Sequence, residues 1–262
     1  MRPATVLTIG GSDPSGCGGI QGDLKVFSAF DVFGMSLITA LTCQNSIGVS
    51  EVMACPASFV SNQGKSIFSD IPVDAVKIGM LSRAENVEAV AALLGSSSQG
   101  NVVLDPVLVS SSGKDMLDED GVDILVNKLI PIVDLVTPNL REASVLANMP
   151  VTDLDEMKSA AAAIWKMGCS YVLVKGGHLE GRALDILFDG ASYEEFDAER
   201  VGGGDFRGTG CALSAAIAAG LAGGASVPAS VKAAKTYVTG AIRSGYRDLG
   251  RGMGILNHNS RN

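Results

Sequence analysis

The sequence predicts an α/β fold in which helices cover both faces of a mostly parallel central sheet. Short apolar runs rich in β-branched residues alternate with longer amphipathic segments along the chain. Some of these runs, such as residues 102–104, are apolar at every position, which is typical of strands buried on both faces. Polar and glycine-rich clusters follow the runs. Because ligands of open parallel sheets bind beyond the carboxyl ends of the strands, we expect these clusters to converge on one site.

The strands are predicted from apolar periodicity and turn signals. The first covers residues 5–9 and ends at Gly10 and Gly11, where the chain leaves the sheet. The other predicted strands are residues 35–41, 75–78, 102–104, 135–137, 171–175 and 184–188.

Helices are predicted between most of these strands. Residues 20–30 place Leu24 and Phe27 on one side and Asp23 off it, which suits an amphipathic helix. Residues 209–222 contain no charged side chain, so we expect this helix to be buried. The remaining predicted helices are residues 57–68, 84–94, 120–130, 140–147, 153–167 and 228–246.

Length and charge limit the classes of function. The 262 residues are 47% hydrophobic and 18% charged, which is enough apolar material for one large core, and we predict a single domain over residues 1–262. A net charge of −8 offers no electrostatic footprint for a nucleic acid. No window approaches the about 18 uninterrupted apolar residues of a membrane span, and the chain runs directly into its first strand. We therefore expect a cytoplasmic protein with neither a nucleic-acid nor a membrane partner.

The cysteines and histidines exclude two further kinds of site. Five cysteines stand at irregular spacings without a CxxC pair, which predicts reduced thiols. The chain has only two histidines, His178 and His258, and neither a GxSxG nor an HExxH motif. A polyhistidine metal site and a serine hydrolase triad are therefore not expected.

Residues 11–17 form the first glycine-rich cluster. They have the spacing of a phosphate-binding P-loop but carry Cys17 where its lysine should stand, and they do not match a dinucleotide-binding fingerprint either. One interpretation is a turn that merely leads a strand into a helix. The other is a ligand loop, which is favoured by the neighbouring polar residues Asp13, Asp23 and Gln44.

The second cluster is Gly208, Thr209, Gly210 and Cys211, at the start of the uncharged helix. The first-turn amides of a helix have no intrahelical partners and lie at the positive end of its dipole, so they can bind an anion without a lysine. In that position we expect a lowered pKa for Cys211. The alternative is that small residues serve only close helix packing.

Three further polar groups follow predicted strands. Asn139 and Glu142 have the spacing of a helix capping box, and one interpretation is that capping is their whole role. Asp105 ends another strand, and two carboxylates beside a phosphate site can hold Mg²⁺ directly or through water. Lys175 is placed to reach a nucleotide phosphate, unless it is simply solvated.

Seven segments of the chain form a characteristic combination: residues 11–16, 19–25, 39–45, 105–107, 137–143, 174–178 and 208–211. Taken together, in this order and spacing, they resemble the hydroxymethylpyrimidine/phosphomethylpyrimidine kinases of thiamine biosynthesis. The resemblance covers roughly residues 6–246 and implies a three-layer ribokinase-like fold, ATP as co-substrate, Mg²⁺ as cofactor, a small pyrimidine alcohol as substrate and commonly a homodimer.

The resemblance also implies a role for individual residues. Asp23 and Gln44 would hydrogen-bond the aminopyrimidine, and Cys211 would accept the hydroxymethyl proton where most ribokinase-like enzymes have an aspartate. Asp105 and Glu142 would organise Mg²⁺. In the same way, the resemblance assigns the pocket walls to Gly11, Met80 and Val107. It assigns the ATP contacts to Lys175, Thr209 and Asn139. The anion hole is assigned to Gly208, Thr209, Gly210 and Cys211.

The sequence departs from the family pattern at a few positions. Arg207 stands where a histidine is frequent and is expected to add positive charge near the phosphates, and residues 110–112 differ from the usual Ala-Lys-Ser. The cysteine that pyridoxal-active relatives carry near Asp105 is absent, since Val109 and Ser110 lie there. A pyridoxine or pyridoxal kinase is therefore the second interpretation, and a non-catalytic pyrimidine sensor is the third.

Overall fold

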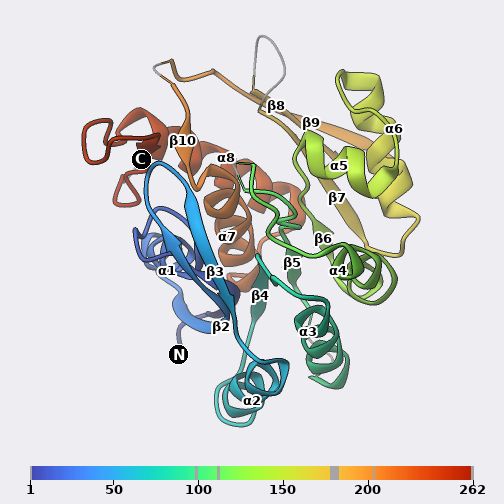
Figure 1. Ribbon diagram of the computed structural model, residues 1–262. Coiled ribbons are helices and arrows are strands. Elements are labelled where there is room, and N and C mark those ends of the chain that lie inside the picture. Colours follow the sequence, from blue (N-terminus) through green and yellow to red (C-terminus); the bar gives the residue numbers. More distant parts are fainter. Residues whose placement is uncertain (1, 98–99, 111–112, 178–182, 203, 261–262) are drawn as a thin grey trace.

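The computed structural model describes residues 2–97, 100–110, 113–177, 183–202 and 204–260 (Figure 1). A nine-stranded sheet with the order β3-β2-β1-β4-β5-β6-β7-β8-β9 forms the middle layer. In this spatial order, all neighbouring strands between β2 and β7 pair in parallel. At the two sides of the sheet, β3 pairs antiparallel with β2, and β8 and β9 add two further antiparallel pairs. The strands are β1 (Thr5–Ser12), β2 (Phe33–Gln44), β3 (Val49–Ala54), β4 (Ala75–Ile78), β5 (Val102–Leu104), β6 (Leu135–Val136), β7 (Tyr171–Gly176), β8 (Ala183–Phe188) and β9 (Tyr193–Ala198).

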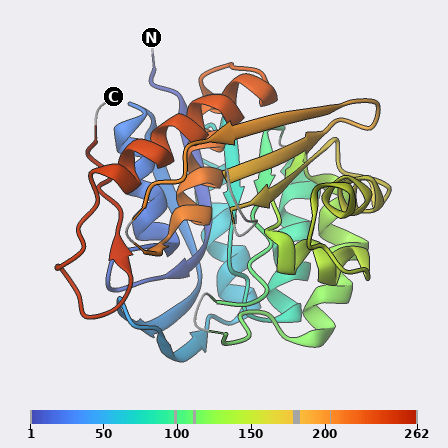
Figure 2. The same ribbon diagram turned by 90° about the horizontal axis from the view of Figure 1, so that it is seen from above.

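Helices cover both faces of the sheet, which confirms the predicted fold class (Figure 2). One face carries α1 (Gly19–Ala29), α7 (Thr209–Ala222) and α8 (Val227–Arg243). The other carries α2 (Ala57–Phe68), α3 (Ala84–Ser97), α4 (Glu119–Ile124), α5 (Leu140–Ala147) and α6 (Leu154–Trp165). Among the described residues, no helix has the length and apolar character needed to cross a bilayer.

The central strands are apolar on both faces because each face packs against a helix layer. In β5, Val102 and Leu104 belong to the core under α3, whereas Val103 belongs to the core under α7. Successive side chains of a strand point to opposite faces, so a strand covered on both sides shows no polar alternation. This arrangement leaves the carboxyl ends of the parallel strands as the place where polar residues can gather.

Several predicted elements differ from the structure. Strands β3 and β9 were not predicted, because both lie at sheet edges and carry polar residues on their exposed side. The helix predicted over residues 120–130 is instead α4, a π-helical turn (Leu125–Leu129) and a 3₁₀ turn (Ile130–Ile132). Pro131 has no N–H to donate, so the α-helical pattern cannot run through it.

A two-stranded parallel sheet joins the start of α7 to the C-terminal segment. It consists of β10 (Phe206–Arg207) and β11 (Gly254–Ile255). The chain leaves α8 at Arg243, three residues before the predicted end, and Tyr246 then pairs with Ile255. The backbone amides of Gly252 and Met253 donate to Ser46 in the β2–β3 loop. The C-terminal segment thereby closes one side of the cavity described next.

Candidate active site

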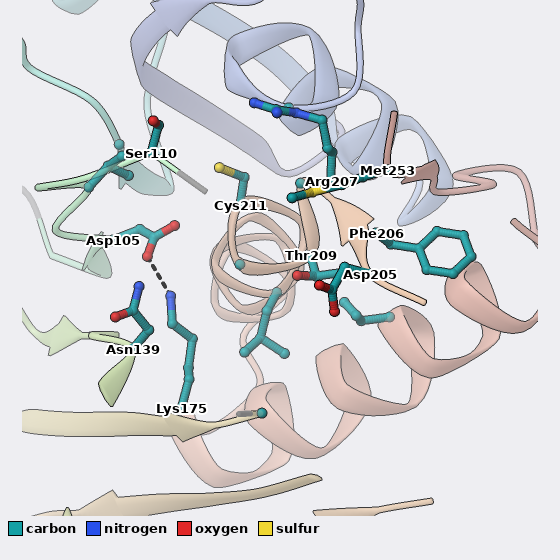
Figure 3. A pocket seen from close by; sticks show the side chains of 18 of the residues that line it. Asp105, Ser110, Asn139, Lys175, Asp205, Phe206, Arg207, Thr209, Cys211 and Met253 are labelled. Carbon is teal, nitrogen blue, oxygen red and sulfur yellow. Dashed lines mark hydrogen bonds and ion pairs between the residues drawn. The ribbon is translucent and has the colours of Figure 1, made fainter. Parts of the chain in front are cut away.

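Every site residue predicted from the sequence lines one cavity of about 790 Å³ at the carboxyl ends of the parallel strands (Figure 3). The cavity therefore brings the glycine-rich clusters together as expected. Their individual roles remain predictions. The residues concerned are Gly11, Asp23, Gln44, Met80, Asp105, Val107, Asn139, Glu142, Lys175, Gly208, Thr209, Gly210 and Cys211.

The loop between β1 and α1 is organised by the buried carboxylate of Asp13. One of its oxygens, Oδ2, accepts hydrogen bonds from the Gly18 amide at 2.9 Å and from Gln44 Nε2 at 2.9 Å. The other accepts from the Ser15 amide and hydroxyl. Asp13 thus fixes the loop and orients the Gln44 side chain, so the loop is more than a passage from strand to helix.

Asp23 faces the protein interior, contrary to the prediction that it lies off the buried side of its helix. It is 1% exposed, and its Oδ2 accepts hydrogen bonds from Thr8 Oγ1 at 2.6 Å and Lys77 Nζ at 2.9 Å. The other oxygen, Oδ1, has no partner among the described residues. The buried ion pair replaces solvent for the charge and leaves one carboxylate oxygen for a ligand.

Lys77 was not predicted as a site residue. Burial acts to lower its pKa, but the negative charge of Asp23, with a smaller contribution from Asp105, outweighs burial and raises the pKa. Lys77 therefore stays an ammonium group beneath the cavity. The available signal was a lysine inside an otherwise apolar strand, β4.

Lys175 forms the second buried ion pair. Its Nζ lies 2.7 Å from Asp105 Oδ1 (Figure 3), and its side chain is only 12% exposed. The alternative of a solvated lysine is therefore wrong. Burial acts to raise the pKa of Asp105, but Lys175 and Lys77 outweigh it and lower that pKa. Ser214 of α7 donates to the other oxygen, Oδ2, at 3.3 Å.

Asn139 and Glu142 form the predicted capping box at the start of α5. Asn139 Oδ1 accepts from the Glu142 amide at 2.9 Å, and Glu142 Oε2 accepts from the Asn139 amide at 2.8 Å. Capping is not the whole environment of Glu142, because burial raises its pKa to about 7 and the nearby Asp105 carboxylate contributes to the rise. Glu142 is thus a carboxylate that gains from a neighbouring cation.

The turn before α7 is built on Gly208. Its φ is +80°, and a Cβ atom there would lie 2.0 Å from the Cys17 carbonyl oxygen, so only glycine fits. No side chain caps α7, and the helix is buried along most of its length. Thr209, Gly210 and Cys211 line the cavity at this uncapped helix start, and their role as an anion site stays a prediction.

The predicted lowering of the Cys211 pKa is wrong for this structure. Burial raises the pKa of Cys211 to about 11; Asp105 and Asp23 add to the rise, while Lys77 and Lys175 oppose it. The helix terminus favours a thiolate, but the loss of water and the two carboxylates have a larger effect. Cys211 is therefore a thiol in the ligand-free protein at neutral pH.

A further buried pair lies where α8 meets β8. Lys235 Nζ is 2.6 Å from Asp185 Oδ2, and Asp185 Oδ1 accepts from the Gly176 amide at 3.0 Å. Sequence reasoning missed this pair because its two members are 50 residues apart. His178, which belongs to one of the segments behind the family resemblance, lies outside the described residues, as do Ser111 and Ser112.

Known proteins share both sequence and structure with this chain. The hydroxymethylpyrimidine/phosphomethylpyrimidine kinase of Aquifex aeolicus is 42% identical over 95% of this chain and 98% of its own length. The thiamine biosynthesis bifunctional protein ThiED of Geobacter sulfurreducens is 44% identical over 97% of this chain, which spans only 52% of that larger protein.

Solved structures give the same picture. The phosphomethylpyrimidine kinase of Clostridium difficile superposes with a TM-score of 0.81 at 39% identity, covering 91% of this chain and 99% of that one. The ADP complex of Bacillus subtilis pyridoxal kinase superposes with a TM-score of 0.91 at 34% identity, covering 99% and 98%. A family model described as phosphomethylpyrimidine kinase matches residues 13–257. The chain belongs to the phosphomethylpyrimidine kinase family, within the ribokinase-like fold.

Proposed function

We propose that this protein is an ATP-dependent kinase of thiamine biosynthesis that phosphorylates 4-amino-5-hydroxymethyl-2-methylpyrimidine and then the resulting monophosphate. One observation carries the proposal: the uncapped start of a buried helix opens into the same cavity as the oriented Gln44 amide. Relatives that match this chain over nearly its whole length carry this activity in their names.

The substrate half of the cavity suits an aminopyrimidine. Gln44 donates to Asp13 through Nε2. Its carbonyl oxygen accepts from Thr42 Oγ1 at 3.4 Å and has a second lone pair for a donor such as a ring amino group. Asp23 Oδ1 offers a second acceptor. Met80 and Val107 supply apolar walls for the ring.

Phosphoryl transfer depends mainly on positioning and charge neutralisation. Lys175 contacts a phosphate of ATP, and the amides from Thr209 to Cys211 hold the transferring phosphoryl group. Cys211 first loses its thiol proton to solvent. The hydroxymethyl oxygen then attacks phosphorus, the bond to the leaving ADP breaks, and the hydroxyl proton passes to the Cys211 thiolate. With a pKa of about 11, forming the thiolate at pH 7 costs about 5 kcal/mol. A turnover of about 1 s⁻¹ corresponds to a barrier of about 17 kcal/mol, which accommodates this cost.

The proton acceptor is tested by Cys211→Ala. If Cys211 is the base, kcat falls by about 100-fold while the KM values stay within about twofold. The kcat of the unaltered enzyme should also rise with pH between 7 and 9, because the thiolate fraction of Cys211 increases toward its pKa of about 11. Unchanged turnover in Cys211→Ala would remove the residue as base.

The carboxylates of Asp105 and Glu142 fit a magnesium ion. They are hard oxygen ligands that follow the neighbouring strands β5 and β6. Burial raises the pKa of Glu142, and the Asp105 charge adds a smaller repulsion that a cation would relieve. Both already accept hydrogen bonds from the protein, Asp105 from Lys175 and Ser214 and Glu142 from the Asn139 amide, so they suit Mg²⁺ through its waters and the nucleotide phosphates rather than as a protein-only cage. In the part of the chain that the structure describes, no group of three or more His, Cys, Asp or Glu side chains gathers as a metal site. Bound Mg²⁺ would neutralise phosphate charge.

The deciding experiment measures ATP consumption by the purified protein with hydroxymethylpyrimidine and Mg²⁺. We expect ADP formation and a product that carries two phosphates. Pyridoxal is the competing substrate, because pyridoxal kinases superpose on this chain with TM-scores of about 0.9. A larger kcat/KM for pyridoxal would favour that function, and no phosphate transfer to either alcohol would favour a metabolite sensor.

We also propose a homodimer that works in the cytoplasm. Leu41, Ile47 and Met53 are exposed on the β2–β3 hairpin at the sheet edge, and an apolar edge of this kind suits burial against a second copy. All five cysteines are free thiols, which suits a reducing compartment. Sedimentation velocity of the protein and of Met53→Lys tests the dimer, since the variant should shift toward monomer.

A further inference from the structure

Arg207 is a buried cation that the mechanism above does not use. It is 5% exposed, and its Nη1 is buried without a hydrogen-bond partner in the described part of the chain. An arginine side chain is always charged in proteins, and a buried charge without a partner is strongly destabilising. Its position therefore calls for an anion that the protein alone does not supply.

The surroundings place Arg207 on the wall of the catalytic cavity. Its backbone lies in β10, paired with Ile255 of β11, and it directly precedes the Gly208 turn. In Figure 3 its guanidinium extends in the direction of the Cys211 thiol and away from Asp205 and Lys175. The side chain is thus held rigidly beside the anion site at the start of α7.

Arg207 differs from the other buried cations around this cavity. Lys77, Lys175 and Lys235 each contact a carboxylate within 3 Å, namely Asp23, Asp105 and Asp185. Their charges are satisfied before any ligand binds. The Nη1 of Arg207 is the buried cationic nitrogen that the described residues leave for a ligand.

We propose that Arg207 binds the phosphate of a phosphorylated substrate, so that this site accepts a phosphate monoester as well as the free alcohol. The assignment rests on the proposed kinase function and deepens it. A guanidinium matches phosphate oxygens with paired donors. Two different phosphate groups come near Arg207 in the proposed reaction: the phosphate monoester of the substrate and the phosphoryl group that ATP transfers. The substrate is favoured because the turn that follows Arg207 packs on the β1–α1 loop, against Cys17 and Gly18, whereas Lys175 lies on the other side of the cavity (Figure 3).

The test compares the two successive substrates in Arg207→Met and Arg207→Lys. For Arg207→Met, the loss of kcat/KM on the pyrimidine monophosphate should exceed the loss on the hydroxymethylpyrimidine by about tenfold or more. Arg207→Lys keeps the charge without the paired donors and should lie between Arg207→Met and the unaltered enzyme. Lys128→Met removes one exposed positive charge far from the cavity and serves as the control for net charge.

Binding provides a readout that does not depend on turnover. Calorimetric titration without ATP should show that the unaltered protein binds the monophosphate more tightly than the alcohol, and that Arg207→Met loses this preference. Equal losses on both substrates together with a raised KM for ATP would overturn the proposal and assign Arg207 to the transferring phosphoryl group. Equal affinities of the unaltered protein for the two pyrimidines would also overturn it, even if Arg207→Met does not fold. Failure of the unaltered enzyme to phosphorylate either compound would instead refute the proposed function itself.

Discussion

The two halves of the cavity treat buried charge differently. In the half formed by β7, β8 and α8, the buried ammonium groups of Lys175 and Lys235 are each held by a carboxylate from another element. In the half formed by the β1–α1 loop, β4 and β10, two buried polar atoms, Asp23 Oδ1 and Arg207 Nη1, have no partner among the described residues. The first half, which we assign to the nucleotide, is organised before ligands arrive. The second half, which we assign to the substrate that is phosphorylated, keeps hydrogen-bonding capacity for a ligand.

Lys175→Met gives the largest expected effect, because it removes a preorganised cation from the nucleotide half. We expect kcat/KM for ATP to fall by about a thousandfold, as for the loss of a group that stabilises transition-state charge. Steady-state kinetics with varied ATP measure it. Lys158→Met on α6 is the matched control, since this lysine lies outside the cavity and pairs with Glu195 on the surface. A loss below about tenfold would show that Lys175 only neutralises Asp105.

Lys77→Met tests whether the stability of the protein depends on the buried Lys77–Asp23 ion pair of the substrate half. Without the ammonium group, the buried Asp23 carboxylate loses its charge partner, and the free energy of unfolding should fall by about 3 kcal/mol. Urea denaturation measures this change.

The double variant Lys77→Met/Asp23→Asn separates stability from binding in the same half. Removing both charges should restore most of the lost stability, because no unpaired charge remains buried. The KM of the double variant for the pyrimidine should nevertheless be higher than that of the unaltered enzyme if Asp23 Oδ1 contacts the substrate. A double variant as unstable as Lys77→Met would show that packing, and not the buried charge, carries the effect.

Local sequence signals predicted the fold well where one element decides its own structure. Strands β4 and β5 have the predicted limits because nearly all their positions are apolar, and α5 begins at Leu140 as predicted because its capping box, with Asn139 as N-cap, is local. The Cys211 pKa was mispredicted because it depends on charges from α1, β4 and β7 as well as on its own helix. The Lys77–Asp23 pair was missed for the same reason, since its members are 54 residues apart.

The smallest expected effect concerns Glu142 and has an unusual sign. Its folded-state pKa of about 7 lies above the ordinary value of 4.5, so between these pH values the unfolded chain releases a proton that the folded protein keeps. The contribution of Glu142 to stability is therefore complete below pH 4.5 and is lost as the pH rises toward 7, by about 2 to 3 kcal/mol. His258, whose pKa burial lowers to about 4, acts in the opposite direction between pH 4 and 6.5.

Glu142→Gln isolates this effect because glutamine also completes a capping box but does not titrate. The difference in unfolding free energy between the enzyme and the variant cancels the contribution of His258, which both proteins share. That difference should move by about 2 to 3 kcal/mol against the enzyme from pH 4.5 to 7.5, as measured by urea unfolding without nucleotide. A difference independent of pH would mean that folding leaves the pKa of Glu142 at its ordinary value of 4.5. The charge of the nucleotide half would then be balanced by Lys175 alone, and a cation would have no repulsion to relieve there.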